Sequence, residues 1–462
     1  MSQTAKFVTG SPMKHVAIMS FTASLGLMAM FAVDFVDMIF ISMLGQSELA
    51  AAIGYAGSIL FFTTSFGIGL AIAAGAIIAR SLGEGDDVTA REQVVYNLLY
   101  GLLFGAAFAA LIWVNIPFLV GLVGATGETA ELAAGYLHII IPSLPIMILG
   151  IIGGAILRAH GAAASAMYAT IFGGLVNAIL DPILIFGLGL DLTGAALATV
   201  ASRFALAGYS LYSVNKATGG FVTPRLEGFF RDLPPVFWIA VPAILTQLAT
   251  PIGSAYVTRS MAEFGEDAVA GMAVIGRLTP LAFGVVFALS GAVGPIIGQN
   301  YGAGLNDRVK RTFWDAIIFV GVFVIVMAGI LFVARDLIVM AFNATGDAQL
   351  LIYAFCGPLA LLFFFNGLLF VANASFNNLG HPYYSTWTNW GRHTIGTIPF
   401  VWLGGLWYGP VGVMSGQFVG GLFFGVIAAL LALRVMNNPA GKEAEPHHVN
   451  VMRPTQLFHG RR

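Results

Sequence analysis

Three acidic residues lie inside long apolar stretches of the sequence, where an ionisable side chain is costly and needs a reason. They are Asp34, Asp37 and Asp181. Asp34 and Asp37 are three residues apart, so a helix places them on one face. Two carboxylates on one face in a low dielectric disfavour double ionisation, so one of them can hold a proton near neutral pH. The alternative is that both acids only hydrogen-bond neighbouring helices, or that Asp34 lines a water-filled vestibule.

Asp181 stands in the segment NAILDP, which combines several useful groups. Asn177 is four residues earlier and shares a helix face with Asp181. Pro182 has no backbone N–H, which frees a carbonyl nearby. Thr199 follows on the next helix back and can bring a hydroxyl to the same place. Together with Asp37, these groups form a candidate site for H⁺ or for Na⁺ held by oxygen ligands. The alternative is a helix-breaking packing motif near the outer surface.

The composition explains why these acids are unusual. The 462-residue chain is 58% hydrophobic and only 9% charged, with a mean hydropathy of +0.87, whereas soluble domains carry about 25% charged residues. Such a surface must face lipid. The apolar runs are long enough for helices of about 20 residues and do not alternate as barrel strands do. We predict an all-α integral membrane protein with about twelve transmembrane helices, over 14–44, 51–80, 92–123, 130–157, 162–187, 191–215, 235–262, 268–298, 309–342, 349–377, 382–406 and 410–436.

The basic residues are divided unequally between the two sides of this topology. Sixteen Lys and Arg residues fall on the side of the two termini, and only Arg259 and Arg335 fall on the other. Because basic loops stay inside, both termini are expected to be cytoplasmic. The expected cytoplasmic parts are segment 1–13, a linker over 216–234 and a disordered tail over 437–462. The net charge of −1 offers no basic field for nucleic acid.

The two halves of the chain resemble each other. AIIARSLGEG (76–85) aligns with PIIGQNYGAG (295–304), and other short matches recur at nearly the same offset. Six spans per repeat is an even number, so both halves have the same orientation and are related by an axis along the membrane normal. We predict two pseudo-symmetric six-helix lobes, an N-lobe over 14–215 and a C-lobe over 235–436, with a substrate route between them. Because Val257 and Phe400 replace the acids in the second half, ion chemistry is expected in the N-lobe.

The sequence lacks the motifs that are typical of several other kinds of function. The sequence has no G-x-x-x-x-G-K-[ST] loop for nucleotide hydrolysis, no Cys/His metal cluster and no G-x-S-x-G nucleophile elbow. Cys356 is the only cysteine, which excludes an intrachain disulfide. Arg277 and Arg392 are interpreted as snorkelling to the interface, and His138 and His393 as structural hydrogen-bonding residues. An enzyme is not expected, no cofactor is expected, and uphill transport would be driven by an ion gradient.

Segments in both halves resemble multidrug and toxic compound extrusion (MATE) transporters. They are VDFVDMIFISMLGQSELAA (33–51), ARSLGEGD (79–86), LRAHG (157–161), NAILDPILIFGLG (177–189), GAALAT (194–199) and GPIIGQNYGAG (294–304). The resemblance runs from Met13 to Met436. It implies two six-helix lobes that export organic cations and amphipathic drugs in exchange for H⁺ or Na⁺. Thr22 departs from the family pattern, since many members have a proline there, about fifteen residues before the first-helix acid.

The resemblance also implies roles for particular residues. Asp37, Asn177, Asp181 and Thr199 match the ion cluster of the prokaryotic DNA-damage-inducible-type subfamily, and they form the candidate Na⁺ site. With Asp34 they make up the expected cation-coupling residues. We expect an adaptable substrate cavity lined by Met28, Met38, Phe364, Asn373 and Asn377. The expected protein is a monomer in the inner membrane of a prokaryote.

Two alternatives keep a membrane fold but change the function. One is a flippase for lipid-linked precursors, although such proteins often have extra helices and a basic central cavity. The other is a membrane-embedded enzyme that uses Asp34 and Asp37 as an acid pair. Two carboxylates three residues apart on one helix are poorly placed to flank a scissile bond, which disfavours the enzyme.

Overall fold

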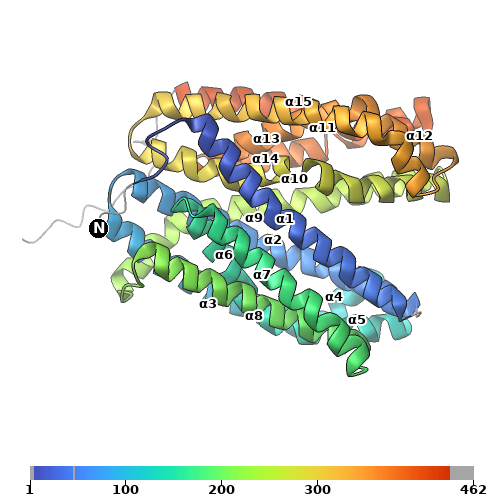
Figure 1. Ribbon diagram of the computed structural model, residues 1–462, viewed down its shortest axis with the longest axis horizontal. Helices are drawn as coiled ribbons and strands as arrows, with labels where there is room; N and C mark the ends of the chain where they lie inside the picture. The colour runs from blue at the N-terminus through green and yellow to red at the C-terminus, as the bar shows by residue number, and fades with distance from the viewer. Residues whose placement is uncertain (1–4, 45–46, 438–462) are drawn as a thin grey trace, which may run out of the picture.

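The computed structural model describes residues 5–44 and 47–437, and the side chains of Asp34 and Met38 lie outside its described part. The chain folds into a bundle of long helices (Figure 1). Its elements are α1 (Pro12–Met43), α2 (Ser47–Gly83), α3 (Asp87–Val114), α4 (Ile116–Leu122), α5 (Gly127–Ile140), η1 (Ile141–Ser143), α6 (Leu144–Ala159), α7 (Ala163–Pro182), η2 (Ile183–Gly187), α8 (Asp191–Thr218), α9 (Leu226–Ala262), α10 (Glu266–Gly302), α11 (Asn306–Ala341), α12 (Gly346–Ala354), η3 (Phe355–Leu359), α13 (Ala360–Asn378), α14 (Pro382–His393) and α15 (Ile398–Asn437).

The helices confirm the predicted all-α membrane fold. Ten helical segments of the described chain are long and apolar enough to cross a membrane. The segment Pro382–Asn437 contains two of the twelve predicted spans, because the backbone reverses at Gly409 (φ 60°, ψ −144°). Beyond this reversal the chain runs back along itself, with Gly404 packed on Gly412 and Gly420 on Gly396. The remaining predicted span, α8, is less apolar and carries Arg203 near its middle.

The expected linker over 216–234 is shorter in the structure. The helix α8 continues to Thr218 and α9 begins at Leu226, so residues 219–225 alone lie outside helices here. The first turns of α9 are held by α3, where the Tyr100 hydroxyl donates to the Phe229 carbonyl. Arg231 forms ion pairs with Asp232 (2.8 Å) and Glu92 (3.5 Å) in the same region.

Two helices, α1 and α9, pass from one lobe to the other. The first half of α1 packs on α10 and α11, where Phe21 meets Phe319 with ring centroids 5.6 Å apart. Its second half packs on α7, and the ring of Phe40 lies 6.0 Å from that of Phe186. In Figure 1, α1 therefore crosses the molecule diagonally. The helix α9 belongs to the C-lobe by sequence, and it packs both on α2 of the N-lobe and on α14 of its own lobe.

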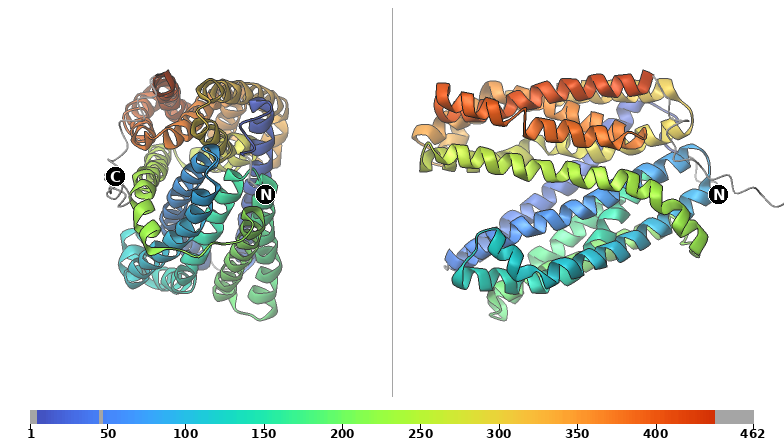
Figure 2. Two further views of the ribbon diagram at one scale, coloured as in Figure 1. Left: turned by 90° about the vertical axis from the view of Figure 1, so that its left-hand side faces the viewer. Right: turned by 180° about the vertical axis from the view of Figure 1, so that it is seen from behind.

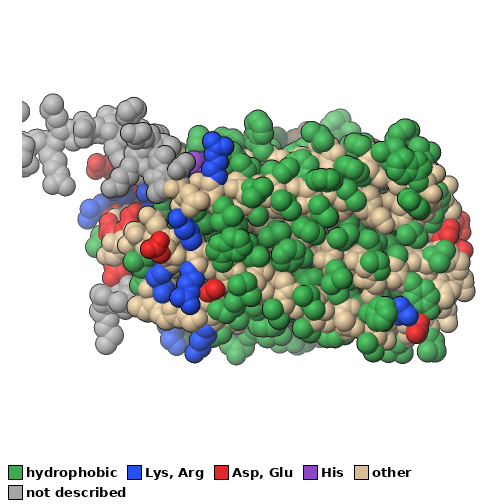
Figure 3. Space-filling model, turned by 90° about the horizontal axis from the view of Figure 1, so that it is seen from above, with side chains coloured by type: hydrophobic (Ala, Val, Ile, Leu, Met, Phe, Trp, Pro, Cys, Tyr) green, Lys and Arg blue, Asp and Glu red, His purple; other side chains and the backbone are tan. Residues whose placement is uncertain are grey.

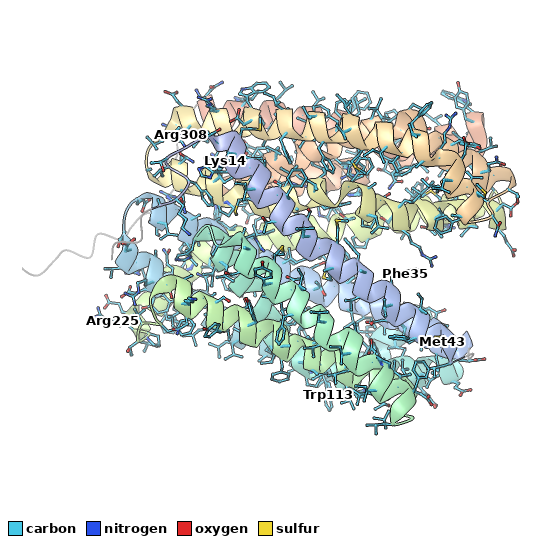
Figure 4. All side chains as sticks on the ribbon, viewed as in Figure 1. Lys14, Phe35, Met43, Trp113, Arg225 and Arg308 are labelled. Atoms are coloured by element: carbon cyan, nitrogen blue, oxygen red, sulfur yellow. The ribbon has the colours of Figure 1, made fainter. Side chains whose placement is uncertain are left out.

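The lobes meet at one end of the molecule and diverge at the other (Figure 2). We name the meeting end the basic end, because Lys14, Arg225 and Arg308 lie there (Figure 4) and most Lys and Arg side chains in view gather there (Figure 3). The opposite end, which carries Met43 and Trp113, is the far end.

The repeated motif explains how the lobes meet. A Cβ atom added at Gly83 of α2 would collide with the backbone of Gln299 on α10. A Cβ atom added at Gly302 of α10 would collide with the backbone of Arg80 on α2. In the alignment of the two motifs, Gln299 is the counterpart of Arg80 and Gly302 is the counterpart of Gly83. The two contacts are therefore one contact repeated about the pseudo-twofold axis, and glycine is needed because the two backbones touch.

Candidate functional site

Asp37 of α1 and Asp181 of α7 meet around the side chain of Asn177. The Asn177 amide nitrogen lies 3.0 and 3.1 Å from the two Asp37 carboxylate oxygens and 2.7 Å from Asp181 Oδ2. Asn177 and Asp181 are buried, at 4% and 1% exposure. Since an amide NH₂ group has only two hydrogens, Asn177 can link the two acids but cannot satisfy all their oxygens. The structure thus brings together three of the residues singled out in the sequence.

Asp181 retains an acceptor that protein groups leave unused. Its Oδ1 atom is buried and has no hydrogen-bond partner among the described residues. The Asp37 and Asp181 carboxyl groups lie close to each other, because both accept from the same Asn177 amide nitrogen. Two adjacent carboxyl groups form a hydrogen bond when a proton lies between them, and a small cation bound there would fill the same need. The donor set therefore fits one H⁺ or one Na⁺.

The local fold of α7 positions these groups. Asn177 and Asp181 are one helical turn apart and face α1 together. After Pro182 the helix widens into the π-helical turn Ile183–Gly187. Gly194 of α8 packs closely against the backbone of Leu184 in that turn. Interrupted helices of this kind are frequent at functional sites, because they leave backbone groups out of the regular ladder.

Thr199 contacts the acids less directly than the sequence suggested. Its hydroxyl donates to the Ala195 carbonyl at 3.0 Å, and the hydroxyl of Tyr136 lies nearby. Tyr136 lies close enough to Asp37 and Asp181 to interact electrostatically with both. Sequence reasoning missed Tyr136, since a tyrosine in an apolar run has no distinctive spacing. It also lines a surface pocket of about 290 Å³ with Glu128, Glu131, Leu132, Gly135, Leu192 and Thr193.

The described residues contain no group of three or more His, Cys, Asp or Glu side chains arranged to hold a metal ion. A Na⁺ ion at this site would therefore depend on the two carboxylates together with neutral oxygens. The Asp34 side chain, also expected here, is outside the described part of the chain. Thr22, which the family resemblance singled out, lies within the uninterrupted helix α1.

The residues expected to line a substrate cavity lie in different environments. Met28 faces α10, where a Cβ added at Gly284 would be 3.5 Å from its Cγ atom. Phe364 packs toward Gly321 of α11. Asn373 and Asn377 are buried on α13, where the Ser385 hydroxyl donates to the Asn373 carbonyl and the Asn377 side chain. Met38 has no described side chain.

The other polar residues of the apolar segments are held within their lobes. His138 is hydrogen-bonded through Nδ1 to the Ala134 carbonyl at 2.7 Å. His393 is buried where α14 meets Gly253 of α9. Arg203, which sequence reasoning did not single out, is buried and donates to the Ile140 carbonyl and to Ser143 Oγ. These contacts account for the positions of His138 and Arg203 without a bound ligand.

The segment before α1 closes the basic end. Phe7 is buried between the lobes and its backbone N–H donates to Gln299 Oε1 at 2.8 Å. Gln299 Nε2 in turn donates to the Ala159 carbonyl at the end of α6, also at 2.8 Å. Arg308 donates to the carbonyls of Phe7 (3.0 Å) and Gly10 (3.1 Å). We call this set of contacts, Phe7 and Gly10 with Ala159, Gln299 and Arg308, the seal.

Comparison with known proteins agrees with both the fold and the repeat. The MatE family profile matches residues 23–183 and 242–403, and its two matches are displaced by the same offset as the repeated motifs. The chain is 28% identical over 429 residues to an FAD transporter of Shewanella oneidensis, covering 90% of this chain and 93% of that protein. It is 29% identical to the multidrug export protein MepA of Staphylococcus haemolyticus, covering 68% and 70% of the two chains.

Solved structures share the architecture. The fold superposes on the Vibrio cholerae MATE transporter VcmN with a TM-score of 0.87 at 23% identity, covering 92% of this chain and 97% of that one. It superposes on a MOP superfamily transporter from Pyrococcus furiosus with a TM-score of 0.86 at 22% identity, covering 94% and 98%. Because one family profile matches both halves, the chain belongs to the MATE family of membrane transporters and is not an enzyme.

Proposed function

We propose that this protein is a secondary-active exporter that expels organic cations and amphipathic drugs in exchange for H⁺ or Na⁺. One observation carries the proposal: the Asp37–Asn177–Asp181 cluster ties the second half of α1 to the N-lobe, while the first half of α1 packs on the C-lobe. A change at this cluster therefore acts on the helix that connects the two lobes.

The coupling follows from differential affinity. With a proton or Na⁺ between the carboxyl groups, α1 and α7 are held together through Asp37 and Asp181. Without it, two negative charges repel each other in a low dielectric and favour a different packing of α1. A cation that binds one arrangement better than the other shifts the equilibrium between them. Na⁺ needs about five or six oxygen ligands, which Thr199 and backbone carbonyls near the π-helical turn can supplement.

The distribution of charge supports an orientation. If the basic end faces the cytoplasm, as basic loops generally do, the seal closes the cytoplasmic side and the lobes diverge toward the outside. This arrangement is the one from which an exporter releases its substrate. We place the protein in the inner membrane of a prokaryote, as a monomer with cytoplasmic termini. Among family branches, the acids of the N-lobe support the DNA-damage-inducible-type subfamily.

Transport in proteoliposomes tests the proposal. We expect ethidium exchange driven by an imposed pH gradient, by a Na⁺ gradient, or by both, and loss of the gradient-driven part in Asp37→Asn. The matched control is Asp336→Asn, which removes an exposed acid near the far end of α11 and should leave exchange unchanged. Transport that ignores both gradients would rule out antiport.

A further inference from the structure

The side chain of Arg158 points from the N-lobe into the space between the lobes. Arg158 is the second-last residue of α6. Its Nη1 atom comes within 3.5 Å of the Cβ position at Gly154, four residues earlier, because helical side chains point back toward the helix N-terminus. Its Nε atom is equally close to the Cβ position at Gly291 on α10 of the C-lobe. The guanidinium thus lies between one helix of each lobe.

This position is on the far-end side of the seal. The Ala159 carbonyl, next to Arg158, accepts the hydrogen bond from Gln299. Gly291 precedes Gln299 by eight residues, which is about 12 Å along a helix, and α10 runs toward the basic end. The guanidinium therefore lies between α6 and α10, on the side of the seal where the lobes diverge.

The positive charge of Arg158 has no partner within the described part of the chain. Among the described residues no hydrogen bond or ion pair reaches its side chain. The two intramembrane acids whose side chains are described, Asp37 and Asp181, are held by Asn177 between α1 and α7 and form no ion pair with Arg158. An unpaired charge away from bulk water is costly, so a partner that arrives with a negative charge would be bound strongly.

An aromatic surface adjoins this charge. Phe287 is one helical turn before Gly291 and shares its face of α10. Phe287 is 37% exposed and Gly291 is also exposed, although α10 is the most buried of the candidate membrane spans. The Phe287 ring is held 5.6 Å from the rings of Phe363 and Phe370. Open space therefore borders a flat apolar surface and a cation within one turn of each other.

We propose that the interlobe space binds an aromatic molecule that carries a phosphate or carboxylate group. The anion pairs with the Arg158 guanidinium, whose fork of donors suits both groups, and the ring system lies against Phe287. This inference rests on the proposed export function and adds a class of substrate to it. It differs from the organic cations that the family resemblance implied.

Binding to the purified full-length protein, without any gradient, tests the inference. Two pairs of probes keep the ring system and change the charge: FMN with riboflavin, and naphthalene-2-carboxylate with naphthalene-2-carboxamide. We expect the anionic member of at least one pair to bind about tenfold or more tighter, as hydrogen bonds to a charged group allow. Arg158→Gln should abolish that preference and Arg158→Lys should restore part of it. Equal affinities within both pairs would overturn the inference.

A second variant avoids the loss of Arg158. Gly291→Asp places a carboxylate next to the guanidinium, whereas Gly291→Asn adds the same volume without the charge. We expect the aspartate variant to lose the anion preference and the asparagine variant to keep it; the reverse, or no difference, would contradict the inference. A single symmetric peak in size-exclusion chromatography and a thermal unfolding temperature near that of the wild type check that each variant is folded. Because these assays need no ion gradient, their failure leaves antiport intact, and failure of antiport leaves them interpretable.

Discussion

The reciprocal glycine contact between α2 and α10 offers a direct test of how the lobes close. In Gly83→Ala the new Cβ atom would lie 2.8 Å from the Cα and carbonyl carbon of Gln299, and closer still to its carbonyl oxygen. Ordinary contacts begin near 3.4 Å, so the backbones must separate by more than half an ångström. Overpacking of this kind costs about 1–3 kcal/mol. Because the cost applies only while the basic end is closed, the closed state should become about 5- to 150-fold less populated relative to the open one.

Spin-label distances across the far end measure this shift. The labels are attached through Glu128→Cys in the N-lobe and Thr345→Cys in the C-lobe, both exposed, with the single native cysteine removed as Cys356→Ser. If opening the basic end brings the far ends together, Gly83→Ala should move the distance distribution to shorter values.

The control for this experiment is Gly57→Ala on the same helix. Its added Cβ would meet nothing within 4 Å, so any general effect of alanine on helix stability is shared and cancels. Gly302→Ala should behave like Gly83→Ala, since its Cβ would strike the Arg80 backbone. A Gly83→Ala distribution that matches wild type and Gly57→Ala would refute the idea that this contact holds the basic end closed.

Three further predictions concern the coupling site and the seal. Asp37→Asn and Asp181→Asn should each abolish drug efflux with near-normal expression, while Asp34→Asn should have a milder effect. Drug-resistance assays compare the variants, and immunoblots of membranes measure their expression. Wild-type resistance in Asp37→Asn would count against the mechanism. Tyr136→Phe removes a hydroxyl near Thr199 and the two acids and should slow ion-driven exchange without weakening ethidium binding, as measured by transport and binding on one preparation. Gln299→Ala removes two hydrogen bonds of the seal, each of which contributes about 1 kcal/mol. The population of the open state relative to the closed state should rise by about tenfold or more in the spin-label experiment. An unchanged distance distribution would show that these hydrogen bonds do not hold the basic end closed.

Local features of the sequence were enough to predict the class of protein, the approximate spans and the repeat. Transmembrane helices are recognised from composition and length alone, because lipid requires an apolar surface and satisfied backbone groups. The repeat was visible in two short motifs, and the two family matches are spaced as those motifs are. Even the pairing of Asn177 with Asp181 follows from helix periodicity, since the residues are four apart.

Only the tertiary structure decided which residues distant in the chain contact each other. Spacing along one helix cannot tell which neighbour a face will meet, so the bridging role of α1, the approach of Tyr136 and the reciprocal fit of Gly83 and Gly302 were not foreseen. Arg158 is the sharpest case. The predicted topology counts it among the sixteen basic residues on the side of the termini, yet the direction of helical side chains turns it inward to Gly291. These features depend on how packed helices cross, which is a property of the whole fold and is not encoded in any single segment.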